Sequence, residues 1–432
     1  MLSARTLAFY CYLPFLSCFV LMVLVMGDIA EAQPRGFNYD ESKVPQFELP
    51  SLLQFKDGRK VESKKDWQLR RQEIFRQFES EVFGRAPQKK VQVTAGPVES
   101  KSILGGTAKL EQVKIELTSQ GPSIDLLILR PANQENVPAF LGLNFMGNHT
   151  VYADSDIWIT ESWVRNDKKL GATSNRAAKA GRGKLANRWS VDQILKAGYA
   201  LVTVYYGDID PDFDDGFQNG LHGKIKAGKT GNPAADEWGS IAAWAFGLSR
   251  VVDYLETNES INAEQVFLLG HSRLGKTALW GGATDPRYAG VISNNSGCGG
   301  AALSKRRFGE TVKRINTSFP HWFCDNFNKY NDNEEDLPID QHMLIALCAP
   351  TPVYVASASE DLWADPRGEF LSIKYASPVF ELLTGKGLNI ASFPEVNTPS
   401  IGTLSYHCRQ GGHDVTAYDW ANYIKFANQF TR

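Results

Sequence analysis

The sequence contains little cysteine, and none of its six cysteines stands in a C-x-x-C pair. That absence argues against a zinc site built from thiolates. An excess of charge is missing too, because 46 Lys and Arg oppose 48 Asp and Glu and leave a formal net charge of −2. A chain without a basic surplus is a poor candidate for binding nucleic acid. We therefore expect no metal, no cofactor and no nucleic-acid partner.

Long apolar runs are equally scarce outside the amino terminus. There, Arg5 precedes an apolar run over residues 7–26, and the segment AEA at 30–32 provides a small-x-small cleavage site. This pattern predicts a secretory signal peptide over residues 1–32, with an uncleaved membrane anchor as the alternative. No other stretch reaches the ~18 apolar residues of a transmembrane helix. We expect a secreted or periplasmic protein, monomeric and free of the membrane once the signal is removed.

Four cysteines lie outside the predicted signal: Cys298, Cys324, Cys348 and Cys408. Export permits disulfides, but four cysteines allow three pairings that the sequence does not separate. The disulfide state therefore stays open.

Internal repeats and low-complexity linkers are absent, so residues 33–432 are predicted to form a single domain. Residues 33–100 hold few apolar runs and are expected to pack on its main body as an N-terminal extension, with a helix over 66–84. Beyond residue 124, apolar runs alternate with helical patterns such as 240–256. The runs lie at 124–132, 138–147, 197–208, 264–272, 289–297, 351–361 and 405–414. This alternation indicates a mostly parallel sheet flanked by helices, a three-layer α/β sandwich.

A basic insertion interrupts this pattern at residues 148–196. Its part at 163–189 carries eight Arg or Lys against one acid. Because it follows the predicted strand 138–147, it should emerge at the carboxyl edge of the sheet, where open α/β sheets bind ligands. We expect it to rim a cleft there, with a solvated loop as the alternative.

An acidic insertion follows at residues 207–237. Asp208, Asp210 and Asp212 alternate as in a calcium loop, but Phe213 and Asn219 stand where an EF-hand has Gly and Glu. We therefore expect a structured loop whose carboxylates cap nearby backbone, and no metal.

The stretch LLGHSRLGK at 268–276 contains the candidate nucleophile. An apolar run enters Gly270-His271-Ser272, and G-x-S between a strand and a helix is the nucleophile elbow of α/β hydrolases. The second glycine is Gly275, three residues after the serine instead of two. A serine that only caps a helix is the alternative. We predict that Ser272 is the nucleophile.

A base and an acid follow the serine in the order that this fold requires. The predicted strand 351–361 ends in Glu360 and Asp361, and the loop CRQGGHDVT presents His413. His413 is the predicted base, and either carboxylate can orient it. His271 and His407 are expected to be structural, whereas His149 and His222, in the insertions, are candidates to line the cleft.

The segment GHSRLGK resembles the G-C/H-S-R-x-G-K signature of glucuronoyl esterases, carbohydrate esterase family 15. The similarity continues through NNSGCGGAALSKRRFGE, SEDLWADP and GGHD. The resemblance implies a single metal-free α/β-hydrolase catalytic domain. It also implies hydrolysis of the ester between the glucuronic acid, or 4-O-methylglucuronic acid, of xylan and lignin alcohols. The implied partner is glucuronoxylan or a lignin–carbohydrate ester.

The same resemblance assigns site residues one by one. It makes Ser272 the nucleophile, His413 the base, Arg273 a member of the oxyanion hole, and Lys276, Glu310 and Trp363 contacts of the sugar. The sequence departs from the family at Asn295, where many members carry the triad acid as Glu. Some bacterial members place the acid after a later strand, which favours Asp361 over Glu360.

Arg273 and Lys276 also argue against a lipase without any family comparison, because a hydroxylated sugar acid benefits from charged donors and a fatty acyl chain does not. Two alternatives stay open. One is an acetyl xylan esterase with the same triad. The other is a non-catalytic carbohydrate-binding homologue.

Overall fold

The computed structural model describes residues 33–87, 93–119, 121–225 and 234–431, so the predicted signal peptide lies outside the described residues. Residues Gln33–Arg432 make up one compact unit. None of the helices in these ranges combines the length and apolarity that a membrane span requires. The four cysteines of this unit, Cys298, Cys324, Cys348 and Cys408, are buried free thiols.

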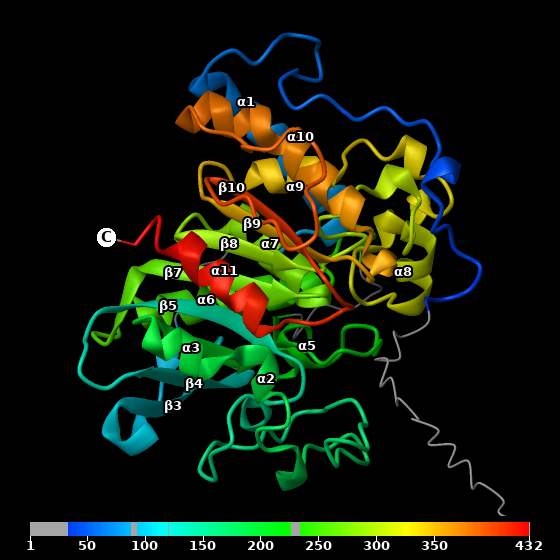
Figure 1. Cartoon of the computed structure of the whole chain (residues 1–432). Helices are drawn as coiled ribbons and strands as arrows, with labels where there is room; N and C mark the ends of the chain where they lie inside the picture. The colour runs from blue at the N-terminus through cyan, green and yellow to red at the C-terminus, as the bar shows by residue number, and fades with distance from the viewer. Residues whose placement is uncertain (1–32, 88–92, 120, 226–233, 432) are drawn as a thin grey trace, which may run out of the picture. The chain divides into compact units, whose positions relative to one another are not determined.

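Ten strands of the described residues form one sheet (Figure 1), in the order β1-β3-β4-β6-β5-β7-β8-β9-β10, with β2 paired to β3. The pairs between β1, β2, β3, β4 and β6 are antiparallel, and those from β6 through β5 to β10 are parallel. Their bounds are β1 Thr94–Ala95, β2 Glu99–Ile103, β3 Ala108–Glu116, β4 Ser123–Pro131, β5 Val137–Asn144, β6 Ala200–Tyr205, β7 Ile261–His271, β8 Gly290–Asn294, β9 Val353–Ala358 and β10 Leu404–Arg409.

The strands from β4 onwards coincide with the apolar runs read from the sequence, whereas the antiparallel edge β1–β3 was not predicted. The sequence of β3 lacks a clear apolar pattern because polar residues occupy some of its buried positions. Glu111 pairs with Arg130 of β4 at 2.9 Å, and Gln112 accepts the Trp158 backbone N–H at 2.7 Å. Because these polar side chains have hydrogen-bonding partners, they can occupy buried positions where a strand is usually apolar.

Helices cover both faces of the sheet. α6, α7, α9 and α10 lie on one face, and α2, α3 and α11 on the other. The bounds are α1 Lys64–Phe78, α2 Ala186–Trp189, α3 Val191–Lys196, α4 Tyr206–Ile209, α5 Gly220–Ile225, α6 Ser240–Leu255, α7 Arg273–Thr284, α8 Val312–Ser318, α9 Gln341–Leu347, α10 Pro366–Thr384 and α11 Ala417–Ala427.

Alternate residues of the strands from β3 to β9 pack in two separate cores. In β7, Leu268 packs with the α6 and α7 face, while Phe267 and Leu269 pack with the α3 and α11 face. This period of two is the geometry of a pleated strand buried on both sides. The three layers and the strand order confirm the predicted α/β-hydrolase fold.

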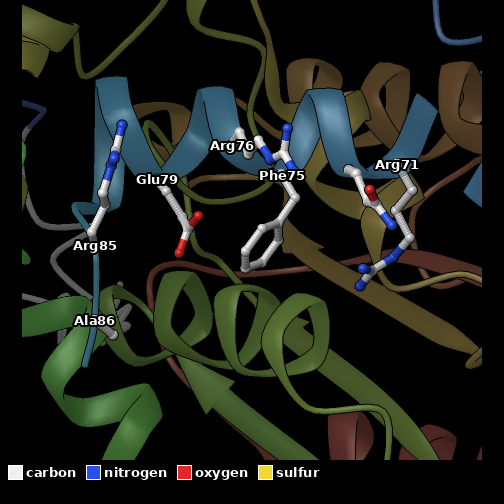
Figure 2. Close-up of a pocket in the computed structure, with 7 residues that line it drawn as sticks. Arg71, Phe75, Arg76, Glu79, Arg85 and Ala86 are labelled. Carbon is white, nitrogen blue, oxygen red and sulfur yellow. The ribbon is translucent and has the colours of Figure 1, made fainter. Parts of the chain in front are cut away.

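The N-terminal helix α1 docks on this body through stacked rings and an arginine. Phe75 stacks on Trp280 of α7 with ring centroids 5.3 Å apart. Arg71 donates to the backbone oxygens of Leu347 at 3.0 Å and Ala283 at 2.6 Å. A cavity of about 450 Å³ lies beneath the helix (Figure 2), lined by Arg71, Gln72, Phe75, Arg76, Glu79, Arg85 and Ala86. None of the predicted site residues borders it.

Candidate active site

Ser272 occupies a sharp turn between β7 and α7. Its backbone has φ 58° and ψ −129°, a region that residues other than glycine rarely adopt. A Cβ at Gly270 would lie 1.8 Å from the carbonyl oxygen of Leu274, so the turn requires glycine there. The Ser272 N–H donates to the Asn294 carbonyl oxygen of β8 at 2.9 Å. Packing therefore holds the serine in a strained conformation at the carboxyl edge of the sheet.

The second glycine of the motif has its own reason. A Cβ at Gly275 would come within 2.9 Å of the Ser296 Cβ, in the segment that follows β8. Gly275 thus lets the first turn of α7 approach that segment. The spacing of three residues after Ser272 reflects this contact.

His413 lies in the loop between β10 and α11 and contacts Asp361. Its Nδ1 is 2.6 Å from Asp361 Oδ2, and the two side chains are 36% and 4% exposed. Asn295, the residue that departs from the family pattern, donates its Nδ2 hydrogen to the same Oδ2 at 2.7 Å. Glu360 is directed elsewhere, to Gln410 Nε2 at 2.5 Å. Of the two candidate acids, Asp361 is the one in contact with His413.

No hydrogen bond joins Ser272 Oγ to the His413 ring within the described residues. Catalytic hydrogen bonds of this kind are often loose until a substrate binds. His271 packs behind His413, with ring centroids 4.5 Å apart and planes tilted by 41°. Burial, and then the neighbouring His413, hold the pKa of His271 well below its ordinary value. His413 is thus backed by an uncharged ring.

The Arg273 side chain turns from α7 into a cluster of aromatic rings and pairs there with Asp212. Its guanidinium carbon lies 4.7 Å from the ring centre of Trp322, which is a cation–π contact. Burial by itself would lower the pKa of Arg273, but Asp212 and then Tyr206 raise it above its ordinary value. The arginine therefore stays charged next to the serine.

Lys276 is buried, with 5% of its side chain exposed. Its Nζ donates to the Ser296 carbonyl oxygen at 2.6 Å and lies 3.6 Å from Glu310 Oε2. Burial raises the pKa of Glu310, and the attraction of Lys276 opposes that shift. The Glu310 N–H donates to the Trp363 carbonyl oxygen at 3.0 Å. The ammonium group of Lys276 is thus enclosed, and its pairing with Glu310 is not a surface salt bridge.

Comparisons with known proteins bear on this arrangement. A family model described as "Glucuronyl esterase, fungi" matches residues 232–384. A carbohydrate esterase named MZ0003, from an unknown prokaryotic organism, is 52% identical over 92% of this chain and 93% of its own. A solved promiscuous CE15 esterase from a marine bacterial metagenome has a TM-score of 0.86 at 52% identity, over 92% of this chain and all of the other. The chain belongs to carbohydrate esterase family 15, the glucuronoyl esterases.

A further solved structure, the glucuronoyl esterase from Solibacter usitatus, has a TM-score of 0.84 at 44% identity, over 90% of this chain and 99% of the other. The resemblance carried by GHSRLGK is confirmed. The protein is therefore a carboxylic ester hydrolase with an α/β-hydrolase fold.

In this esterase, residues just after the predicted cleavage point lie against the candidate site, a more specific position than the expected packing of the extension on the main body. Gln33 donates its Nε2 hydrogen to the Glu360 carbonyl oxygen at 2.8 Å. The Phe37 ring meets Trp363 edge-on at 4.8 Å. The Gly309 N–H donates to the Asn38 carbonyl oxygen at 2.8 Å. The extension thus packs on the loops that carry Asp361, Trp363 and Glu310.

The three alternating aspartates of the acidic insertion, Asp208, Asp210 and Asp212, each contact a different partner. Asp208 accepts from Thr160 at 2.6 Å, Asp210 contacts His222 at 2.8 Å, and Asp212 pairs with Arg273. These three carboxylates have side-chain partners. The expected backbone caps are made by Asp214, which accepts the Gly216 N–H at 3.2 Å, and by Asp215, which accepts the N–H groups of Gln218 at 3.2 Å and Asn219 at 2.9 Å. Across the described ranges, no group of three His, Cys, Asp or Glu side chains is arranged to hold a metal ion.

The expectation that two histidines line the cleft is also wrong. His149 and His222 are 1% and 0% exposed. His222 binds Asp210 through one ring nitrogen and the Trp238 carbonyl oxygen through the other. Burial lowers the pKa of His149 to about 4. Both rings belong to the packing of the insertions.

The basic insertion reaches the neighbourhood of the site. Arg188 Nε lies 2.7 Å from Asp414 Oδ1, beside His413, and Arg165 Nη2 lies 3.4 Å from Asp212 Oδ2. The four lysines of its part at 163–189, Lys168, Lys169, Lys179 and Lys184, are exposed. Some charged side chains of the insertion are therefore held in ion pairs, and others are exposed to solvent.

Proposed function

We propose that this esterase hydrolyses esters of glucuronic acid or 4-O-methylglucuronic acid, including those that join glucuronoxylan to lignin. The observation that carries the proposal is the enclosed pair of Lys276, one helical turn after Ser272, and Glu310, whose side chains are 5% and 9% exposed. Together they offer a donor and an acceptor to sugar hydroxyls. A fatty acyl chain has no hydroxyl groups for either side chain to bind, so it would gain nothing from this pair.

The reaction begins when Ser272 Oγ attacks the ester carbonyl carbon and His413 Nε2 takes its proton. The carbonyl oxygen becomes an oxyanion, which the Arg273 backbone N–H and guanidinium stabilise. Asp361 keeps the Nδ1 proton of His413 in place and stabilises the imidazolium. The oxyanion then collapses, the bond to the alcohol breaks, and His413 returns the proton to the departing oxygen.

The second half of the reaction frees the acid. The first half leaves an acyl-enzyme in which glucuronate is esterified to Ser272. Water attacks that carbonyl while His413 Nε2 takes its proton. The bond from the carbonyl carbon to Ser272 Oγ then breaks, and His413 gives the proton to Ser272 Oγ. Trp363 and Glu310 hold the sugar throughout.

Acid release from benzyl glucuronate tests this proposal. Wild type should release glucuronic acid and Ser272→Ala should not, with an unchanged thermal unfolding midpoint. Rapid hydrolysis of a long-chain fatty ester, together with no turnover of benzyl glucuronate, would contradict the substrate assignment.

An acetyl xylan esterase activity is the second candidate. The solved relative at 52% identity is described as promiscuous. The carbonyl chemistry is the same for both esters, so relative rates on benzyl glucuronate and on acetylated xylan decide between them.

We also propose that residues 1–32 direct export and are removed. The N-terminal residue of the protein recovered from the medium or periplasm should then be Gln33. A full-length chain retained in the membrane fraction would overturn this.

A further inference from the structure

The Asp212 carboxylate is fully buried and collects donors from four separate segments of the chain. Its side chain is 0% exposed. Oδ1 is contacted by His321 Nε2 at 2.9 Å and Trp322 Nε1 at 2.7 Å, and Oδ2 by Tyr206 OH at 2.8 Å, Arg165 Nη2 at 3.4 Å and Arg273 Nη1. Burial would raise the pKa of Asp212, but its hydrogen bond to His321 and the charge of Arg273 bring it well below the ordinary value.

Arg273 is held from several sides at the same place. Its guanidinium lies 4.7 Å from the ring centre of Trp322, 5.5 Å from that of Phe319 and 5.7 Å from that of Phe145. Its Nε is buried and has no hydrogen-bond partner in the part of the chain that the structure describes. The arginine is therefore anchored by Nη1 and keeps a donor without a protein partner.

We propose that Asp212 is a positioning residue for the esterase reaction, because it fixes the Arg273 guanidinium where the oxyanion forms. This inference rests on the oxyanion role proposed above for Arg273. An arginine side chain has several rotatable bonds, and ordering it in the transition state would cost free energy. An anchor that orders it beforehand removes that cost from the catalytic step.

The other donors on Asp212 make this anchoring compatible with catalysis. A carboxylate paired with Arg273 alone would neutralise the charge that the oxyanion needs. Here His321, Trp322 and Tyr206 share the negative charge of Asp212, so the guanidinium is oriented without being its only partner. Because these donors also stabilise the buried negative charge, the carboxylate depends less on Arg273 for its stability.

A matched control lies in the same insertion. Asp208 is buried like Asp212, at 7% against 4% exposure of the whole residue. It accepts from Thr160 Oγ1 at 2.6 Å instead of contacting Arg273. Asp208→Asn therefore repeats the chemical change of Asp212→Asn in a similar environment without touching the arginine.

The test is a double-mutant cycle on benzyl glucuronate. Removal of an oxyanion donor costs about 10²–10³-fold in kcat, so we expect Arg273→Ala to lose that much and Asp212→Asn to lose roughly 10-fold or more, with KM nearly unchanged. In the Arg273→Ala background, Asp212→Asn should have no further effect on kcat. Asp208→Asn should stay near wild type.

The possible failures are distinguishable. If Arg273→Ala leaves kcat intact, the oxyanion role itself falls. If Arg273→Ala is defective but folded Asp212→Asn is as active as wild type, or if the two losses multiply, Asp212 does not act through Arg273.

Tyr206→Phe decides the matter if Asp212→Asn does not fold. It removes one donor from Asp212 Oδ2 and leaves the carboxylate in place. A change in kcat that disappears in the Arg273→Ala background supports the inference. An unchanged kcat overturns it.

Discussion

The two halves of the proposed active site are built in opposite ways. The proton-transfer half, His413 with Asp361, presents a ring that is 36% exposed and is held mainly by one 2.6 Å contact and the packing of His271. The cationic half, Arg273 with Lys276, is 15% and 5% exposed and surrounded by buried partners. One half is open on its outer side, and the other is fixed on nearly all sides.

The difference follows from what each group must do. A base takes a proton from Ser272 and gives it to the departing alcohol, then takes one from water and returns it to Ser272, so its ring has to adjust between these oxygens. A charge that stabilises an oxyanion is most effective when it does not reorganise. Truncation in the proton-transfer half should therefore abolish turnover, whereas substitution in the cationic half should be graded.

The largest effect is expected in the proton-transfer half. Ser272→Ala and His413→Ala should each lose about 10³-fold or more in kcat. Both should remain folded, because Ser272 Oγ and the outer face of His413 contribute little to packing. The measurement is kcat on benzyl glucuronate, with thermal unfolding as the control. Retention of a tenth of the activity by either variant would remove that residue from the mechanism.

The second-largest loss of kcat is expected from substitution of the proposed acid. Asp361→Asn should lower kcat by at least about 10²-fold, because the amide cannot stabilise the imidazolium. Glu360→Gln is the matched control, since its side chain binds Gln410, and it should remain within about threefold of wild type. Equal losses in the two variants would mean that the carboxylates support the loop and not the base.

A smaller, substrate-dependent effect is expected in the cationic half. Lys276→Met keeps the aliphatic stem but removes the ammonium group, and we expect it to raise KM for benzyl glucuronate about tenfold, the value of one hydrogen bond to a charged group. A small acetyl ester has no sugar hydroxyls, so its KM should hardly change. The same increase for both substrates would make Lys276 only the partner of Glu310. Unfolding midpoints separate that outcome from a loss of stability.

The sequence predicted the parallel sheet well and offered candidate site residues in chain order, because both leave local signals. The run into Gly270 marks the elbow, and SED and GGHD follow at later strand ends. It did not predict the Asp212 cluster, whose donors come from positions 165, 206, 273, 321 and 322. Such convergence is a property of the folded chain. An acidic run resembles a solvated loop until the partners of each carboxylate are known.

The strand end SED offered two carboxylates as the acid, the resemblance to the family favoured Asp361, and the structure separates the two by contact. Glu360 faces Gln410, while Asp361 is turned inward by the Asn295 amide. Asn295 therefore contacts the candidate acid from the position where the resemblance to the family implies a glutamate in many members. Sequence alone marked this residue as a departure without indicating what it contacts.

The smallest effect should come from the basic insertion, outside both halves. Arg165 and Arg188 are paired with Asp212 and Asp414, but Lys168, Lys169, Lys179 and Lys184 are exposed. We expect these lysines to attract polyanionic glucuronoxylan. Because the Debye length falls to roughly 3 Å at 1 M salt, turnover of the polymer should then decrease about two- to threefold while that of benzyl glucuronate stays constant.

Neutralising the four lysines together should remove the salt dependence of polymer turnover. The matched control neutralises four exposed lysines of the N-terminal extension, Lys56, Lys60, Lys64 and Lys65, and should leave it unchanged. Equal responses to the two sets would show that net charge, and not the position of the insertion, attracts the polymer. If polymer turnover is insensitive both to salt and to the four changes, the insertion has no electrostatic role in substrate capture. The cationic half of the site would then act on the sugar acid only after the substrate has bound.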